Sequence, residues 1–221
     1  MNNNRIPSHL NPWLNISASD YESHMDSEQV GQLSILKQIF ADTVITFSPQ
    51  CLAVVGCATG NGFDHIDPKV TQRVIGIDIN KAYLDILRNR YIHHLSELEL
   101  ICSDITSCTL QSESIDLIHA ALIFEFVDPR QVLPKLVSWL KPDGILSVVL
   151  QVPSCESEFV SETGYTSLKQ LESIIQPVNH CIFKGLANKY HLKEIESREI
   201  ELKLGKRFNV GYYQKLNGSE V

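Results

Sequence analysis

Short apolar runs alternate along this chain with longer stretches of helical periodicity. Runs of this length bounded by turn residues are typical of buried strands, and they occupy residues 51–55, 73–78, 98–102, 115–120 and 144–152. Between them, apolar residues recur at helical spacing over 30–47, 81–95 and 129–140. Alternating strands and helices favour a parallel sheet with right-handed crossovers and with helices on both faces.

The two ends of the chain have a different pattern. Residues 1–20 are polar, and Ser19 or Asp20 is placed to cap a following helix. We expect a loop over 153–166, a helix over 167–175, and two alternating strands over 194–204 and 207–215. The short connection at Gly205-Lys206 predicts that these strands form an antiparallel hairpin. We divide the chain into an N-terminal segment with cap helices, 1–47, and a main domain, 48–221, within one folded unit.

The first apolar run ends in a loop of small residues, Gly56-Cys-Ala-Thr-Gly-Asn-Gly62. Glycines at 56, 60 and 62 allow positive φ angles and let a ligand approach the backbone. We expect a helix to begin near Phe63, with its first N–H groups facing a polar or anionic ligand. The second run ends in Asp78, at the position where nucleotide-binding α/β folds place a carboxylate on ribose hydroxyls.

This loop resembles motif I of the class I S-adenosylmethionine-dependent methyltransferases, which runs G-x-G-x-G. Further signatures of that family follow in its order at Asp78, at Cys102-Ser-Asp104, at Ser114-Ile-Asp-Leu-Ile-His119 and at Leu140-Lys-Pro-Asp-Gly144. The resemblance covers roughly residues 50–152. Two positions depart from the family pattern: Val54 stands where an acid is frequent, and Ala58 replaces the middle glycine.

The resemblance implies a Rossmann-like, doubly wound α/β fold with a seven-stranded, mostly parallel sheet in the order 3-2-1-4-5-7-6 and an antiparallel last strand. It implies S-adenosyl-L-methionine as cofactor. Asp78 would accept the ribose hydroxyls, Ile79 would cover the adenine, and Asp104 with the Ile105 N–H would meet the adenine edge. The other implied cofactor-binding residues are Tyr21, Gly56, Cys57, Ala58, Gly60 and His119.

Three side chains are candidates for catalysis in this family setting: His119, Glu125 and His24. His119 could act as a general base, but a lone histidine on an apolar strand is more often a satisfied core residue. Glu125 could orient an amine or take a proton, and a solvated acid at a helix start is an equal alternative. Tyr21 or His24 could close the site, or belong to a surface helix with a docked aromatic ring.

Composition narrows the class of protein. The chain has 221 residues and a net charge of −7, whereas general nucleic-acid binding usually shows a basic footprint. No apolar run reaches the length of a membrane span, and the six scattered cysteines predict reduced thiols in a cytoplasmic protein. No Cys/His/Asp cluster has metal-ligand spacing, so we infer no metal. We expect a monomer or homodimer that acts on a small-molecule acceptor, and neither nucleic acid nor membrane as a partner.

Two other functions stay open at the level of sequence. One is a non-catalytic regulatory subunit that binds S-adenosylmethionine, because an obvious catalytic base is missing. The other is a nicotinamide-dependent oxidoreductase. Its fingerprint G-x-G-x-x-G would need a third glycine where this chain has His65.

Overall fold

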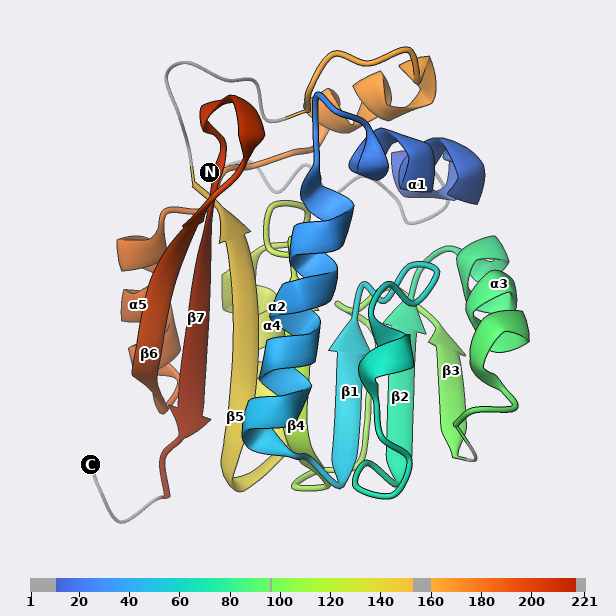
Figure 1. Ribbon diagram of the computed structural model, residues 1–221. Coiled ribbons are helices and arrows are strands. Elements are labelled where there is room, and N and C mark those ends of the chain that lie inside the picture. Colours follow the sequence, from blue (N-terminus) through green and yellow to red (C-terminus); the bar gives the residue numbers. More distant parts are fainter. Residues whose placement is uncertain (1–10, 96, 153–159, 218–221) are drawn as a thin grey trace.

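The computed structural model describes residues 11–95, 97–152 and 160–217. Its centre is a seven-stranded sheet in the order β3-β2-β1-β4-β5-β7-β6 (Figure 1). The strands are β1 (Cys51–Val55), β2 (Arg73–Asp78), β3 (Leu98–Cys102), β4 (Ile115–Ala121), β5 (Leu140–Gln151), β6 (Leu192–Glu201) and β7 (Arg207–Lys215). The pairs from β3 to β5 are parallel, and β7 is antiparallel to both β5 and β6. The predicted fold class, strand order and antiparallel last strand are confirmed.

Each face of the sheet is covered by two α-helices. On one face α2 (Gln32–Phe47) and α3 (Lys81–Tyr91) pack on the side chains of Leu52, Val74 and Leu117. On the other face α4 (Pro129–Trp139) and α5 (His180–Lys189) pack on the side chains that alternate with these along the strands. Because the central strands contribute side chains to both clusters, β1 reads as a continuous apolar run.

A further layer lies over the carboxyl ends of the parallel strands. It consists of η2 (Pro12–Asn15), α1 (Ala18–Asp26) and the 3₁₀ helix η4 (Thr166–Ser173), and η4 meets the first two at one end of the sheet although it is far from them in sequence (Figure 1). Ile16, Leu168 and Leu171 are buried in a small apolar cluster between them. We refer to these three elements as the cap layer.

Several predicted elements need correction. The helix expected to begin near Phe63 is reduced to the single 3₁₀ turn η3 (Phe63–His65), because Asp67-Pro68, which the sequence predicts to end it early, follows at once. The cap of α1 is Ser17, whose side chain accepts the Asp20 N–H, and not Ser19 or Asp20. The predicted helix 167–175 is a 3₁₀ helix, and the hairpin connection contains η5 (Lys203–Gly205). Helix α5 was not anticipated, and part of the expected loop 153–166 lies outside the described residues.

Candidate functional site

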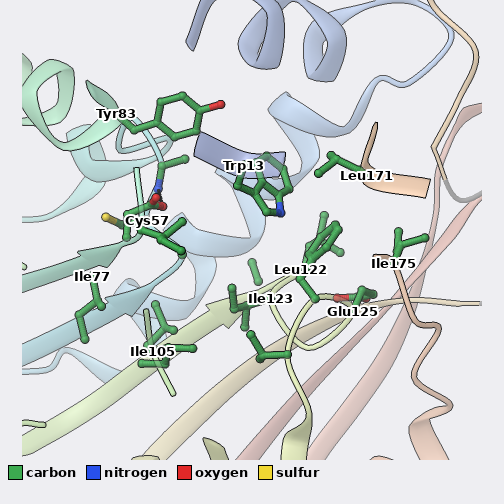
Figure 2. Close-up of a pocket in the computed structure, with 18 of the residues that line it drawn as sticks. Trp13, Cys57, Ile77, Tyr83, Ile105, Leu122, Ile123, Glu125, Leu171 and Ile175 are labelled. Carbon is green, nitrogen blue, oxygen red and sulfur yellow. Dashed lines mark hydrogen bonds between the residues drawn. The ribbon is translucent and has the colours of Figure 1, made fainter. Parts of the chain in front are cut away.

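A cavity of about 830 Å³ lies between the carboxyl ends of the central strands and the cap layer. Its floor comes from the segments that follow β1, β2, β3 and β4, and its roof comes from the cap layer and the start of α2. Figure 2 shows Cys57 and Tyr83 at one end, Glu125 and Ile175 at the other, and Trp13 between them. In open α/β sheets, ligands bind at this edge, where the strand order reverses between β1 and β4.

The glycine-rich loop shapes the floor of this cavity. Gly56 has φ +68°, and a Cβ there would lie 3.2 Å from the Ile123 side chain. Ala58 also takes a left-handed conformation, with φ +44°, which costs an L-residue roughly 1–2 kcal/mol. Gly56, Cys57 and Ala58 line the cavity.

Gly60 and Gly62 have a different position from the one that the sequence suggested. Neither lines the cavity. A Cβ on Gly60 would lie 2.9 Å from both Leu87 and Tyr91 of α3, and one on Gly62 would lie 2.9 Å from Phe40 of α2. These two glycines let helices α2 and α3 pack closely behind the loop. At these two positions the glycines therefore serve helix packing and do not line the ligand cavity.

Asp78, at the end of β2, joins the loop to the site. Its Oδ2 accepts the Ala58 N–H at 2.9 Å, and its Oδ1 accepts the Asn80 N–H at 2.8 Å. The helix cap that follows is Asn80, which accepts the N–H groups of Ala82 and Tyr83. Burial raises the pKa of the Asp78 carboxyl, and the N–H donors oppose that rise. A carboxylate offers about four acceptor positions, so acceptor capacity remains beyond these backbone bonds.

The loop after β3 supplies the neighbouring part of the wall. Asp104 lines the cavity, and its Oδ1 accepts the backbone N–H and the hydroxyl of Thr106 at 2.8 and 2.7 Å. The carboxylate therefore organises its own loop while it faces the cavity. Ile79 and Ile105 also line this end, where they form an apolar surface next to Asp78.

Aromatic rings separate this end of the cavity from solvent. Tyr21 of α1 stacks on Tyr83 of α3 at 5.7 Å between ring centroids, and its edge meets Trp13 at 5.8 Å. Burial and the charge of Asp78 raise the pKa of the Tyr21 phenol, so it stays protonated at neutral pH. The backbone carbonyl of Trp13 accepts the Asn80 side-chain N–H at 2.9 Å. The cap layer is thus held directly to the start of α3.

Both candidate histidines are buried and neutral. His119 of β4 pairs its Nδ1 with the Ser147 hydroxyl at 3.0 Å, and His24 of α1 pairs its Nδ1 with Thr163 at 2.8 Å. Burial lowers the pKa of each imidazole to about 4, with Lys206 adding to the effect at His24. Both line the cavity, but an imidazole of this pKa holds a proton weakly and is a poor general base at neutral pH.

Glu125 lies in the turn after β4 and is 1% exposed, so it is not a solvated acid at a helix start. The turn opens with Leu122 in a left-handed conformation, φ +54°. The Glu125 Oε1 accepts the Gln151 N–H at 2.7 Å, while its Oε2 has no hydrogen-bond partner among the described residues. Burial raises the pKa of this carboxyl to about 7.

The structure adds cavity residues that the sequence did not point to. Trp13, Gln32, Gln151, Leu171 and Ile175 all line it. They come from four separate segments and carry no motif, so no local signal identifies them. Only the polarity of Gln32 and Gln151 within apolar surroundings hints at a site.

Other sequence predictions concern metals, thiols and membranes. Within the described ranges, no group of three or more His, Cys, Asp or Glu side chains could hold a metal ion. Five cysteines are free thiols, and Cys155 lies outside the described residues. None of the helices in the described part of the chain is long and apolar enough to cross a membrane.

Residues 53–148 match the protein family described as "Methyltransferase domain". No curated protein is significantly similar to this chain in sequence. The matched residues run from within β1 to within β5 and include the small-residue loop, Asp78, Asp104 and Glu125.

Solved structures with the same fold include three that differ in chemistry. The N-methyltransferase NodS from Bradyrhizobium japonicum, solved with S-adenosylhomocysteine, superposes with a TM-score of 0.67 at 14% identity and covers 90% of this chain and 98% of its own. Geranyl diphosphate C-methyltransferase from Streptomyces coelicolor gives 0.65 at 11%, covering 85% and 83%. The [4+2]-cyclase SpnF gives 0.66 at 13%, covering 83% and 81%. At these identities the likeness establishes the fold.

Proposed function

We propose that this chain is a class I S-adenosylmethionine-dependent methyltransferase, and that it transfers the methyl group of this cofactor to a small-molecule acceptor. The observation that carries the proposal is the position of Asp78. Its carboxylate lines the cavity and is bonded to the backbone of the small-residue loop. A carboxylate with acceptor positions to spare, beside a loop whose backbone is accessible, fits an adenosyl ligand with a ribose diol.

The described residues fit the cofactor part by part. Asp78 would accept the ribose hydroxyls, and Ile79 with Ile105 would cover the adenine. The backbone of Gly56 to Ala58 would lie along the methionine part. The acid that the family often has is Val54 here, and Asn61 is a neutral cavity-lining side chain whose Nδ2 already donates to the Leu33 carbonyl. Its side-chain oxygen is the candidate acceptor for the cofactor's amino group.

The cavity has room for a second molecule. Pockets for ligands occupy roughly 300–1,000 Å³, and the 830 Å³ here lies near the upper end. The cofactor supplies an electrophilic methyl group when bound. The protein's contribution would be to hold the acceptor in line with that methyl group and to exclude water. Tyr21, Trp13 and His24 in the cap layer would provide that exclusion.

The nicotinamide alternative fits the structure less well. A dinucleotide-binding fold places the pyrophosphate at the N-terminus of the helix that follows the glycine loop. Here only the three-residue turn η3 follows that loop. The regulatory-subunit alternative retains one supporting observation, which is that both cavity histidines are too weakly basic to serve as general bases. SpnF is described as a cyclase, so this fold is compatible with other chemistry and activity must be measured.

The test is a calorimetric titration of the purified protein with S-adenosylhomocysteine, with NADH in parallel. Saturable binding of S-adenosylhomocysteine at one site per chain, without NADH binding, supports the proposal. No heat of binding at millimolar S-adenosylhomocysteine would refute it. Binding without turnover on any acceptor would favour the regulatory subunit.

A further inference from the structure

Glu125 has a fixed position at the end of the cavity away from Asp78. Its backbone carbonyl accepts the Gln176 N–H at 2.7 Å, and its side-chain Oε1 accepts the Gln151 N–H at 2.7 Å. The turn after β4 is therefore held both by the end of β5 and by the segment after η4. Because Glu125 is held by one hydrogen bond at its backbone and one at its carboxylate, the side chain has little freedom to turn toward solvent.

The second carboxylate oxygen is the anomaly. Oε2 is buried and has no hydrogen-bond partner among the described residues, and Glu125 lines the cavity. Leaving a buried polar group unsatisfied costs roughly 1–3 kcal/mol, and more for a charged one. Protonation does not remove the problem, because a carboxylic acid O–H at Oε2 would lack an acceptor. Such groups in native structures call for an explanation, and a ligand that donates a hydrogen bond provides one.

The charges around the cavity indicate which ligand that is. Four carboxylates line it, from Asp78, Asp104, Glu125 and Asp128, against one guanidinium, from Arg130. That guanidinium is on the surface and already binds Asp128 through its Nε at 2.9 Å and an Nη at 2.8 Å. The buried histidines are neutral. The balance is negative, which disfavours an anionic acceptor and favours a cationic one.

The surroundings of Glu125 are otherwise apolar. Figure 2 shows Leu122, Leu171 and Ile175 around its side chain, with Trp13 on the side toward the cofactor end. Val160, Leu168 and Ile174 also line the cavity, and they belong to the apolar cluster of the cap layer. A ligand that fits here has an apolar body and one polar group that reaches the carboxylate.

We propose that the methyl acceptor is an amine carried on an apolar body, and that Glu125 Oε2 receives its N–H. The inference rests on the proposed methyltransferase function and names its substrate class. The acceptor enters as an ammonium ion, and the Glu125 carboxylate takes one proton from its nitrogen. The freed nitrogen lone pair forms the new N–C bond, while the methyl carbon's bond to sulfur breaks and its electron pair stays on sulfur. The products are a methylated ammonium and S-adenosylhomocysteine, and Glu125 then loses its proton to water.

A carboxyl with a pKa near 7 suits this role, since it is ionised in part at neutral pH and accepts a proton without becoming a strong acid. The positive charge of the acceptor also explains how the ionised form of the buried Glu125 carboxyl is tolerated. An ammonium ion beside a buried carboxylate stabilises its charged state.

The test uses matched probes at saturating S-adenosylhomocysteine. Calorimetry compares phenylalkyl and alkyl amines with the alcohol and the carboxylic acid on the same carbon skeleton. We expect amines of the series to bind at least tenfold more tightly than their matched alcohols, and the acids not to bind. Glu125→Gln keeps an oxygen for the Gln151 N–H and should lose that preference while its affinity for S-adenosylhomocysteine is unchanged. Glu172→Gln, the same change at an exposed position of η4, should behave as wild type.

The outcomes separate the two proposals. Equal binding of alcohols and amines, tighter binding of acids, or no binding of any amine while S-adenosylhomocysteine binds would overturn the amine proposal. An unchanged amine preference in Glu125→Gln would remove Glu125 from the recognition of the acceptor. Failure of S-adenosylhomocysteine itself to bind would instead refute the methyltransferase function.

Discussion

Replacing Asp78 with asparagine removes the charge that the cofactor site depends on while keeping the side chain's shape. In the wild type, both carboxylate oxygens accept a backbone N–H, from Ala58 at 2.9 Å and from Asn80 at 2.8 Å. An asparagine keeps one oxygen and turns an NH₂ group toward the other N–H. The variant therefore loses one acceptor, its negative charge and one of these two backbone hydrogen bonds, while the N–H groups of Gly56 and Cys57 still bond to the Ile77 carbonyl of β2.

The magnitude follows from the bonds at stake. A hydrogen bond to a charged group contributes roughly 1.5–3 kcal/mol, and each 1.4 kcal/mol is about a tenfold change in affinity. Losing one of two ribose bonds in Asp78→Asn should thus weaken S-adenosylhomocysteine binding about 10- to 100-fold. The Asp78→Ala change removes both and should weaken binding further.

Isothermal titration calorimetry with S-adenosylhomocysteine measures this directly. Asp85→Asn is the matched control, because Asp85 is an exposed acid of α3 paired with Lys81. It should leave the affinity unchanged. Urea unfolding without ligand separates a lost binding contact from a lost fold. If Asp78→Asn stays folded and binds within twofold of wild type, the assignment of Asp78 to the ribose is wrong.

Three further predictions concern stability, pH and release of the cofactor. Gly60→Ala places a Cβ 2.9 Å from α3 side chains, on a residue with φ +86°, and should lower the free energy of unfolding by about 1–3 kcal/mol. Gly185→Ala in α5 has open space around it and should raise the free energy of unfolding by up to about 1 kcal/mol. Urea titration measures both changes. The raised pKa of Glu125 means that the folded state binds more protons than the unfolded state between pH 4.5 and about 7. The stability that this group contributes is present below that window and is lost as pH rises through it. The free energy of unfolding of Glu125→Gln should therefore rise relative to that of the wild type by up to roughly 1.4 kcal/mol per pH unit within the window. A difference between the two proteins that does not change with pH would contradict this. Glu22→Gln weakens the ion pair with Arg90 that connects α1 to α3, and stopped-flow measurements should show faster dissociation of S-adenosylhomocysteine. The free energy of unfolding should change by less than about 1 kcal/mol. An unchanged dissociation rate would show that α1 does not control release from the cavity.

The strands of the sheet could be predicted from the sequence because the patterns that mark them are made of consecutive residues. The central strands are buried on both faces and appear as continuous apolar runs, and the boundaries of β1 and β2 agree with the prediction at both ends. Helix α5 was missed because only Phe183 and Ala187 are buried on it and because Gly185 within it has a low helix propensity. Its N-cap, Asn179, after Pro177, was the available signal.

The site was readable only where it is built from consecutive residues. The small-residue loop and Asp78 are separated by a spacing that the sequence shows, and Asp78 lines the cavity together with the first part of the loop, Gly56 to Ala58. Trp13, Leu171 and Gln151 are brought there by packing between segments far apart in sequence. The burial of Glu125 depends on β5 and on the segment after η4, so its environment could not be read from the residues beside it.

A crystal structure of the protein with S-adenosylhomocysteine tests the central claim most directly. We expect the ribose hydroxyls to bind the Asp78 carboxylate, the backbone of Gly56 to Ala58 to lie along the homocysteine part, and unfilled volume to remain between the sulfur and Glu125. Ligand density elsewhere, or an Asp78 carboxylate with no contact to the ribose of a bound ligand, would contradict it.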